Sequence, residues 1–460
     1  MTTPSAPLLL RRVFPHRRDE TIQCTHLLRS VPGKREVLDA RWNDQPVVVK
    51  IFFHPCQARR HLRREWRGLN AVMARELTSQ KPLFYGRTDA GRWALVVEKI
   101  VDSRPATDVF AGLPEGPERV ELLKNVCREL ATYHDRGVLQ RDMHLGNFLL
   151  KGERAFMLDS GQMTFRSRPV TREEGISQVA LLGGILQDDD EDSLRSLCRA
   201  YLEARGYRPS DADEAAMMSL HGRYRKAAVL RGLKKTLRTS KRYRRVEGQA
   251  YRAVYERAFF EDADLGPWLE RLNGPAGAGE DAKRGKAPSV FTLEWNAKKM
   301  VVRRYRERGR IRAILPAFET SRAKRGWVNG HLLRMLGIGT PRPVCCVEFH
   351  RGCLVRESFL ILECIEGNTL AETLRDPDLP ARRREALLHQ VRQRVHRLHE
   401  HRIVHGDLKQ AHILVSAQGP VLTDLDRMKV CRWDFPFKIR RDKDLKRLNL
   451  DGPGKEPARV

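Results

Sequence analysis

An internal repeat, whose two copies keep one register over a long stretch, places the strongest constraint on the fold. Five pairs of polar or charged residues are each 265 positions apart, and no gap interrupts the register between them. Such agreement is hard to obtain by chance, so we expect the chain to contain two copies of one fold. The pairs are Glu98 and Glu363, His134 and His399, Asp142 and Asp407, Asn147 and His412, and Asp159 and Asp424.

A change in composition indicates where one copy ends and the next begins. Residues 273–288 are rich in glycine, alanine, proline and charge and lack large apolar side chains, which is typical of a linker. We therefore predict a first domain over residues 1–272 and a second over residues 289–460. Only 36 residues follow Asp424, so the helical part of the second domain is expected to be short and to end in a helix near residues 440–450.

Local patterns in the first copy predict strands followed by helices. Apolar, β-branched runs indicate buried strands, and apolar residues at helical spacing indicate amphipathic helices. Predicted strands cover residues 46–53 and 93–100, predicted helices cover 58–77 and 117–135, and two short strands cover 147–151 and 155–158. The predicted fold class is therefore α+β, with two tandem two-lobed domains, each a small β-rich lobe followed by a helical lobe.

Three polar residues of the first copy have the spacing that phosphoryl transfer requires. Asp142 lies five residues before Asn147, and Asp159 follows Asn147 by twelve residues, beyond a predicted hairpin. Asp142 would face the attacking hydroxyl, while Asn147 and Asp159 would converge on Mg²⁺ that bridges the phosphates of ATP. Singly, each residue has an ordinary explanation in a turn or cap, but their order and spacing together favour catalysis.

A lysine and a glutamate upstream complete this arrangement. Lys50 lies in a predicted apolar strand, and Glu65 follows 15 residues later on the next predicted helix. An ion pair between them would orient the ammonium toward the α and β phosphates of a nucleotide. Neither copy contains a glycine-rich loop, and Gly33 is the only glycine before Lys50. The phosphates are therefore expected to be covered less tightly than in protein kinases.

These motifs resemble those of the protein-kinase-like superfamily. Asp142, Asn147 and Asp159 follow its D-x-x-x-x-N and D-x-G patterns, and the D-x-H-x-G-N sequence of residues 142–147 is similar to the small-molecule kinase branch. The second copy narrows the resemblance to the bacterial lipopolysaccharide core kinases, the heptose and Kdo kinase family. The stretches that carry this resemblance are residues 300–311, 321–344, 405–415 and 423–427.

The resemblance implies two protein-kinase-like domains and an ATP-dependent, Mg²⁺-requiring kinase. Its expected substrate is a sugar hydroxyl of the lipopolysaccharide inner core, presented by a core precursor. The implied roles are Asp142 as base, Lys50 as phosphate anchor paired with Glu65, Asn147 and Asp159 as Mg²⁺ ligands, and the backbone near Glu98 as the adenine contact.

The second copy departs from this pattern at several positions. Arg303 stands in place of the lysine and Gly326 in place of the helix glutamate, so no equivalent ion pair is expected. His412 replaces the asparagine and retains the capacity to bind a metal or to hydrogen-bond to Asp407. We therefore expect the second copy to be weakly active or a pseudokinase. Its corresponding residues are Asp407 for catalysis, Arg303 and Glu363 for nucleotide binding, and His412 and Asp424 for metal binding.

Two further departures concern residues that would support the catalytic loops. Gln140 stands where protein kinases usually have histidine, whereas His405 fills that place in the second copy. Asp444, near the C-terminus, has two interpretations: it braces the second catalytic loop, or it lies on the solvated face of a helix.

Charge indicates anionic partners. The formal net charge is +28, and residues 221–246 contain eleven Lys or Arg and no acid, with Leu230, Leu233 and Leu237 forming an apolar stripe. One interpretation is a solvated helix packed on the first helical lobe; another is a surface that contacts lipopolysaccharide precursors or the anionic inner membrane. No RNA-recognition signature accompanies the segment, so nucleic acid is not the expected partner.

The expected location is cytoplasmic, with peripheral contact to the inner face of the cytoplasmic membrane. No run approaches the ~18 apolar residues of a membrane span, and Leu8–Leu10 is too short for a secretory signal. Two other functions remain open from the sequence: a kinase for another small molecule or a protein, and a non-catalytic pseudokinase scaffold. Residues 161–175 lack an A-P-E signature, which argues against a protein substrate.

Overall fold

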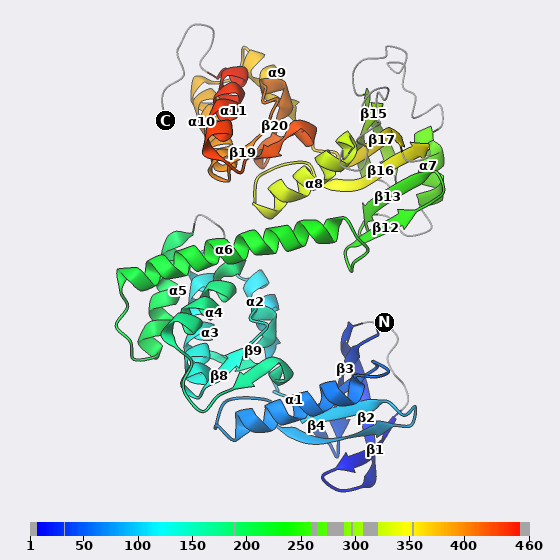
Figure 1. Ribbon diagram of the computed structural model, residues 1–460, viewed down its shortest axis with the longest axis vertical. Coiled ribbons are helices and arrows are strands. Elements are labelled where there is room, and N and C mark those ends of the chain that lie inside the picture. Colours follow the sequence, from blue (N-terminus) through cyan, green and yellow to red (C-terminus); the bar gives the residue numbers. More distant parts are fainter. Residues whose placement is uncertain are drawn as a thin grey trace. The chain divides into compact units, whose positions relative to one another are not determined.

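The computed structural model describes residues 7–31, 33–186, 190–259, 265–273, 289–295, 298–306, 321–351 and 354–450. The chain forms two compact units, Met1–Lys226 and Ala227–Val460, which are described separately below. The boundary between them falls within the long helix α6 (Asp211–Thr236) (Figure 1).

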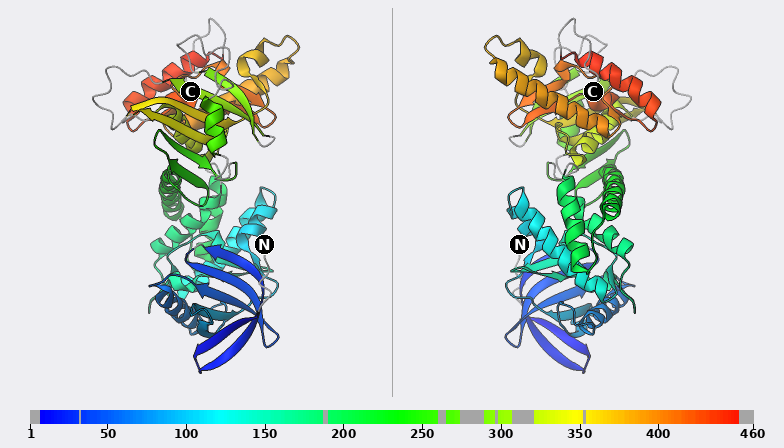
Figure 2. Two further views of the ribbon diagram at one scale, coloured as in Figure 1. Left: turned by 90° about the vertical axis from the view of Figure 1, so that its right-hand side faces the viewer. Right: turned by 90° about the vertical axis from the view of Figure 1, so that its left-hand side faces the viewer.

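The first unit begins with a closed antiparallel barrel, seen in blue in Figure 2. Its strand order is β1 (Leu8–Phe14), β2 (Arg18–Val31), β3 (Arg35–Trp42), β4 (Gln45–Phe52), β6 (Trp93–Glu98) and β5 (Pro82–Thr88). Helix α1 (Ala58–Met73) packs on the outside of this barrel through Leu62 and Leu69.

Strand β4 reads as a continuous apolar run because both of its faces are buried. Val47 and Val49 point into the barrel core, whereas Val48 and Phe52 pack on the side that α1 covers. Successive side chains of a strand alternate between faces, so Lys50 shares the face of Val48 and Phe52. The alternation therefore directs the Lys50 ammonium toward α1.

Helices dominate the remainder of the first unit. They are α2 (Ala106–Gly112), α3 (Pro117–Asp135), α4 (Arg172–Leu182), α5 (Glu191–Ala204) and the first part of α6. Between them lie β7 (Arg104–Pro105), β8 (Val138–Gln140), β9 (Phe148–Lys151), β10 (Arg154–Met157) and β11 (Met163–Phe165), together with the 3₁₀ turns η1 (Leu145–Asn147), η2 (Ser160–Gln162) and η3 (Gly183–Ile185). Buried side chains of α3, α4 and α5 form one core with the short strands.

The second unit is built on a six-stranded antiparallel sheet. Its order is β12 (Tyr243–Glu247), β13 (Tyr251–Glu256), β16 (Pro343–Arg351), β17 (Leu354–Glu363), β15 (Lys298–Arg306) and β14 (Ser289–Trp295). Helix α8 (Arg322–Met335) packs on this sheet through Ala323 and Trp327, and α7 (Leu265–Asn273) contributes Trp268 to the core beside Tyr255. The helices that follow are α9 (Leu370–Arg375), α10 (Ala381–Glu400) and α11 (Asp434–Leu448).

Both units share one order of elements after their sheets. In the first unit, β7, α2, α3, β8, η1, β9, β10, η2 and β11 follow one another. The second unit has β18 (Asn368–Thr369), α9, α10, β19 (Ile403–Val404), η8 (Gln410–His412), β20 (Ile413–Ser416), β21 (Gly419–Leu422), η9 (Leu425–Arg427) and β22 (Lys429–Val430). The strand pairs also correspond, because β9 pairs with β10 as β20 pairs with β21, and β8 pairs with β11 as β19 pairs with β22.

The boundary between the units differs from the prediction. Residues 227–272 were predicted to end the first domain, but they belong to the second unit. The physical reason is strand pairing: the β12–β13 hairpin joins the second sheet through β16, with Tyr255 opposite Cys345. A two-stranded hairpin is marginally stable alone and gains stability at a sheet edge. After Asn273, the predicted linker over residues 273–288 lies outside the described residues.

Candidate active site

Lys50 and Glu65 meet in the first unit as predicted from their spacing. The Lys50 ammonium donates to Oε1 of Glu65 across 2.5 Å, and both side chains are buried. Burial disfavours the charged carboxylate, but the positive charges of Lys50 and Arg35 hold the pKa of Glu65 below its ordinary value. The ion pair is therefore present at neutral pH, and it holds the Lys50 ammonium against Glu65 in the middle of α1.

Arg35 is a site residue that the sequence analysis did not identify. It begins β3 and pairs with Phe52 at the end of β4, which brings its guanidinium toward α1. Nη1 lies 3.5 Å from Oε2 of Glu65 and 3.7 Å from Oδ1 of Asp159. Arg35 directly follows Gly33 and Lys34 of the β2–β3 connection, and it places a positive charge beside Glu65 and Asp159.

Asp159 is positioned by an unusual backbone conformation. It has φ of 58° in the left-handed region, which costs energy for a residue other than glycine. The next residue, Ser160, anchors the turn because its hydroxyl donates to the Glu65 carbonyl across 3.2 Å. Gly68 on α1 permits this contact, since a Cβ at that position would lie 2.4 Å from the Ser160 carbonyl oxygen. Asp159 is thereby held beside the Lys50–Glu65 pair.

The loop that carries Asp142 is organised by Asn147 and Gln140. The Asn147 amide nitrogen donates to the Asp142 carbonyl across 2.7 Å, and the Leu158 N–H donates to the Asn147 carbonyl across 2.7 Å. Gln140 Nε2 donates to the Leu158 carbonyl across 3.1 Å. These bonds tie the loop to the residue that precedes Asp159, so Asp142, Asn147 and Asp159 are held in one network.

The Asp142 carboxylate points outward. Its side chain is 67% exposed, and the ring of His144 lies beside it, with Nε2 at 3.6 Å from Oδ2. An exposed carboxylate on a loop fixed from behind is accessible to an incoming hydroxyl.

Glu98 lies at the end of β6, beside the predicted nucleotide site. Its backbone is opposite Val47 of β4, and its N–H donates to the Lys81 carbonyl across 2.8 Å. Its side chain is exposed. The structure thus places Glu98 at the strand end that leads into the helical half, while Lys50 lies three residues further along the neighbouring strand.

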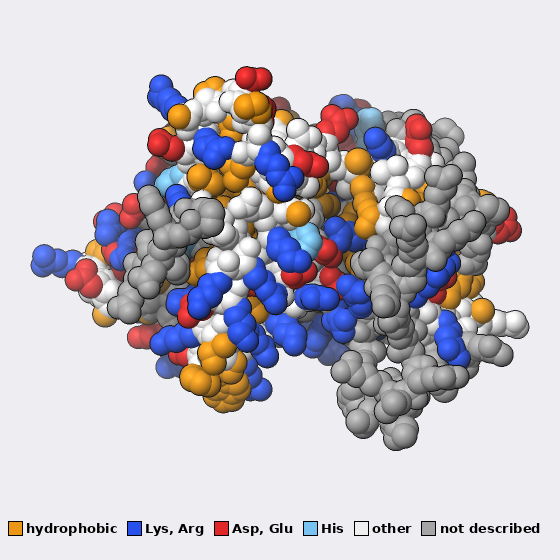
Figure 3. Space-filling model, turned by 90° about the horizontal axis from the view of Figure 1, so that it is seen from above, with side chains coloured by type: hydrophobic (Ala, Val, Ile, Leu, Met, Phe, Trp, Pro, Cys, Tyr) orange, Lys and Arg blue, Asp and Glu red, His pale blue; other side chains and the backbone are white. Residues whose placement is uncertain are grey.

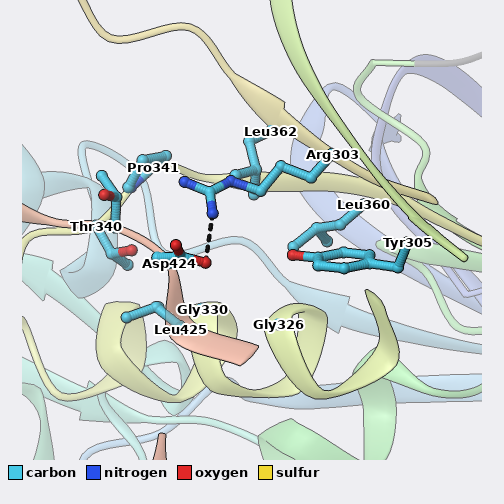
Figure 4. Close-up of a pocket in the computed structure, with 11 residues that line it drawn as sticks. Arg303, Tyr305, Gly326, Gly330, Thr340, Pro341, Leu360, Leu362, Asp424 and Leu425 are labelled. Carbon is cyan, nitrogen blue, oxygen red and sulfur yellow. Dashed lines mark hydrogen bonds and ion pairs between the residues drawn. The ribbon is translucent and has the colours of Figure 1, made fainter. Parts of the chain in front are cut away.

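In the second unit, Arg303 contacts a different partner from Lys50. The Arg303 guanidinium donates to Oδ1 of Asp424 across 2.5 Å, which Figure 4 shows beside a small cavity. The cavity is lined by residues of β15, α8, β17 and the segment before η9, including Tyr305, Gly326 and Leu360. Burial opposes ionisation of Asp424, but the charge of Arg303 lowers the pKa of its carboxyl.

Gly326 explains why the Lys–Glu arrangement is absent from the second unit. A Cβ at Gly326 would lie 2.5 Å from Cδ2 of Leu360, so a larger residue requires the end of the Leu360 side chain to move. A glutamate at this position would have to displace Leu360. Gly326 carries no carboxylate, and the guanidinium of Arg303 binds Asp424.

The loop around Asp407 repeats the hydrogen bonds of the loop around Asp142 with other side chains. His412 Nδ1 lies 2.7 Å from the Asp407 carbonyl, as the Asn147 amide does from Asp142, and His412 Nε2 lies 3.3 Å from Oδ2 of Asp424. His405 Nε2 lies 2.8 Å from the Thr423 carbonyl, which corresponds to the Gln140 contact. Asp424 also has a left-handed backbone, with φ of 64°.

Asp444 braces the second loop, which confirms one of the two interpretations from sequence. Its carboxylate is buried and accepts hydrogen bonds from the backbone N–H of His405 at 2.6 Å and of Gly406 at 3.0 Å. Arg447, three residues later on α11, donates to the Gly406 carbonyl across 2.7 Å and lies 3.8 Å from Asp407. Helix α11 therefore holds the loop in place.

Glu363 is the last residue of strand β17 in the second unit. Its N–H donates to the Arg342 carbonyl across 2.9 Å. This is the position that Glu98 has at the end of β6, where the Glu98 N–H donates to Lys81. The structure thus places both glutamates at equivalent strand ends of their own units.

The basic segment over residues 221–246 packs in a way that differs from the prediction. Residues 227–246 of this segment belong to the second unit. There Leu233 and Leu237 contact two hydrophobic cores of the unit, and Trp327 Nε1 donates to the Thr236 carbonyl across 3.1 Å. The predicted apolar stripe is thus largely used in folding, although Leu230 is exposed. In the described residues, no helix combines the length and apolarity needed to cross a bilayer.

One part of the chain matches a known protein family. Residues 277–451 match the lipopolysaccharide kinase (Kdo/WaaP) family. The Kdo/WaaP segment lies within the second unit and includes Arg303, Asp407 and Asp424. The family resemblance inferred from residues 300–311, 321–344, 405–415 and 423–427 is therefore confirmed for this segment.

The comparisons with solved structures and with curated proteins carry no further information on the function of the chain. The kinase domain of PknI from Mycobacterium tuberculosis is a similar solved structure, with 19% identity and a TM-score of 0.30, over 44% of this chain and 95% of that chain. No curated protein matches the chain.

Proposed function

We propose that the protein is an ATP-dependent kinase that phosphorylates a sugar hydroxyl of the lipopolysaccharide inner core. In this proposal the chain consists of two tandem protein-kinase-like domains, and the first is the main catalytic one. The observation that carries the proposal is the meeting of the Lys50–Glu65 pair with Asp159, next to a loop that presents Asp142 outward. The family of the Kdo/WaaP segment supports the substrate class.

The residues of the first unit fit a nucleotide with Mg²⁺. The Asn147 amide nitrogen is used in the bond to Asp142, which leaves its amide oxygen for a metal, and Asp159 adds carboxylate oxygens. Oxygen donors of this kind suit Mg²⁺, which neutralises charge on the phosphates when bound. Lys50 and Arg35 would bind the phosphates, and the backbone near Glu98 would contact the adenine.

Asp142 is the proposed general base. Its exposed carboxylate would accept the proton of the attacking sugar hydroxyl, while Asn147 and Gln140 keep the loop in register with Asp159. Catalysis in this scheme depends on position and charge stabilisation, since the side chains form no covalent bond to the phosphoryl group.

We propose that the second unit is weakly active or a pseudokinase. Asp407 would be its base, Arg303 and the region of Glu363 its nucleotide contacts, and His412 and Asp424 its metal ligands. Both oxygens of Asp424 have partners, Arg303 at 2.5 Å and His412 at 3.3 Å, so a metal would have to displace at least one of them. The same contacts favour a non-catalytic scaffold as the second candidate function of this unit.

The proposed location is the cytoplasm, with peripheral contact to the inner membrane face where core precursors are assembled. The basic segment 221–246 would contribute attraction for anionic lipid or phosphorylated glycan. Because Leu233 and Leu237 are packed within the second unit, they would not insert into the bilayer. The segment would bind the membrane through the charge of its Lys and Arg side chains.

The decisive experiment measures core phosphate by mass spectrometry in cells that carry single variants. Asp142→Ala and Asp159→Ala are each expected to lower phosphorylation about a hundredfold or more, as loss of a base or metal ligand does. Asp407→Ala is expected to have a smaller effect. Unchanged phosphate in both first-unit variants would refute the proposal, and an equal loss in Asp407→Ala would assign catalysis to the second unit as well.

A further inference from the structure

The segment from β22 (Lys429–Val430) into the first turns of α11 exposes four large apolar side chains. Val430, Trp433, Phe435 and Ile439 are 61%, 69%, 76% and 43% exposed. We call these four residues the apolar tip. Phe435 and Ile439 are four residues apart on the helix, so their side chains lie on the same side, and Trp433 is the residue that precedes the first turn.

The opposite side of α11 makes the contacts that the unit needs. Asp444 and Leu448 are buried there, and the Phe437 ring lies 6.1 Å from the ring of His399 on α10. Packing and loop support are thus complete without the apolar tip. Two large aromatic side chains that are about three-quarters exposed on one helix end indicate an interaction surface.

Positive charge surrounds the apolar tip. The exposed basic residues from β22 to the last turns of α11 include Lys429, Arg432, Lys438, Arg440, Lys443 and Lys446, which we call the basic rim. The two exposed acids of this segment, Asp434 and Asp442, are bound to Arg402 at 2.9 Å and Arg441 at 3.0 Å, neither of which belongs to the rim. Figure 3 shows Lys and Arg side chains gathered beside exposed hydrophobic ones on the face in view.

This combination matches the chemistry of an anionic bilayer surface. Trp and Phe side chains favour the interfacial region of a bilayer, and Lys and Arg gain energy from anionic headgroups. Val430 and Ile439 add aliphatic surface to the tip, and the chain carries a formal net charge of +28. The basic segment 221–246 lacks such a tip, because most of its apolar stripe is packed within the unit.

We propose that the apolar tip and basic rim of α11 form a docking surface for anionic phospholipid membranes. The tip inserts at the headgroup level, and the rim binds the acidic headgroups. Helix α11 also holds the second catalytic loop through Asp444 and Arg447, so docking fixes that loop at a defined position near the membrane. If the proposed substrate is lipid-linked, this surface brings the chain to it; the membrane binding itself does not depend on kinase activity.

The test uses the full chain and flotation with vesicles. Vesicles of phosphatidylcholine containing phosphatidylglycerol are expected to carry the protein, and vesicles of phosphatidylcholine alone are not. The double variant Trp433→Ser/Phe435→Ser is expected to reduce binding roughly tenfold, and Lys443→Glu/Lys446→Glu by a similar factor. Asp142→Asn is expected to bind as the parent does, which separates this proposal from the proposed catalytic activity.

Matched controls distinguish the α11 surface from its alternatives. Leu27→Ser/Leu28→Ser makes the same kind of change at two exposed residues of β2 and is expected to have no effect. The proposal is overturned if the Trp433→Ser/Phe435→Ser protein binds vesicles as well as the parent does. It is also overturned if binding is lost only in the Lys234→Glu/Lys235→Glu variant of the basic segment. A shift from dimer to monomer in the Trp433→Ser/Phe435→Ser protein would overturn it too, because the tip would then be an interface between copies.

Discussion

The guanidinium of Arg303 donates to the carboxylate of Asp424 across 2.5 Å, and Asp424 is the proposed metal ligand of the second unit. In the first unit the corresponding cation, Lys50, is bound to Glu65 at the same distance. One substitution on a helix accounts for the difference, because Gly326 offers Arg303 no carboxylate.

Removal of Arg303 should therefore improve metal binding by the second unit. In an Asp159→Asn background, Arg303→Ala is expected to strengthen Mn²⁺ binding roughly tenfold, because one oxygen of Asp424 loses its competing cation. Electron paramagnetic resonance during Mn²⁺ titration measures this affinity. Arg304→Ala is a matched control, since Arg304 lies on the same strand and binds Glu357. Equal affinities in the two variants would contradict a competition between Arg303 and metal.

Arg35 is expected to bind the phosphates in place of a glycine-rich loop. Arg35→Ala should raise the KM for ATP about tenfold with a smaller change in kcat, because one cation near the phosphates is lost. Arg35→Lys should restore part of the affinity, and Arg11→Ala, at an exposed pair on β1, should change nothing. The proposed role fails if KM for ATP is unaffected in Arg35→Ala.

Gln140 and His405 make equivalent hydrogen bonds, so each unit should tolerate the other's residue. Gln140→His is expected to keep most of the activity of the first unit, because its Nε2 can still donate to the Leu158 carbonyl. Gln140→Ala is expected to lower kcat roughly tenfold, since the loop loses its tie to the residue before Asp159. Steady-state kinetics distinguishes these outcomes. Similar losses of kcat in Gln140→His and Gln140→Ala would show that the hydrogen bond to the Leu158 carbonyl does not support the activity.

Asp444 should protect the backbone of the second catalytic loop from exchange. Asp444→Ala leaves the N–H groups of His405 and Gly406 without their acceptor, which should cost about 3 kcal/mol of local stability. Hydrogen exchange measured by mass spectrometry is expected to show faster exchange across this loop. Asp442→Ala removes an exposed carboxylate two residues earlier on α11 and serves as the control. Unchanged protection in the Asp444 variant would rule out the brace.

Acid should destabilise the second unit through His331. This ring is buried beside Trp327 and Tyr243, and burial lowers its pKa to about 3, well below the ordinary value near 6.5. Because the unfolded chain takes up the proton first, the contribution of this residue is complete above about pH 6.5 and is lost as the pH falls. The loss amounts to about 2 kcal/mol at pH 5.

Denaturation of the parent and of His331→Gln at a series of pH values checks this expectation. The parent should lose more stability between pH 7 and pH 5 than the variant does, while both keep the acid sensitivity that other buried histidines confer. Parallel pH profiles for the two proteins would show that His331 does not titrate as its burial indicates.

The sequence determined the local elements and the main site residues of this protein. The apolar run around Lys50, the helix over residues 117–135 and the hairpin between Asn147 and Asp159 all occur within a few residues of their predicted bounds. These features depend on strand alternation, helical spacing and short loops, which are interactions between near neighbours. The Lys50–Glu65 pair could be predicted for the same reason, since a strand and the helix that follows it are adjacent.

Only the tertiary structure decided which distant residues meet. Arg35 reaches Asp159 across more than a hundred positions of sequence, and nothing local distinguishes it from a solvated strand residue. The β12–β13 hairpin joins the second sheet because an edge strand of that sheet can pair with it, a partner that the hairpin sequence does not specify. Arg303 binds Asp424, which lies 121 positions later in the sequence. Each of these outcomes depends on long-range packing, which residue patterns along the chain do not encode.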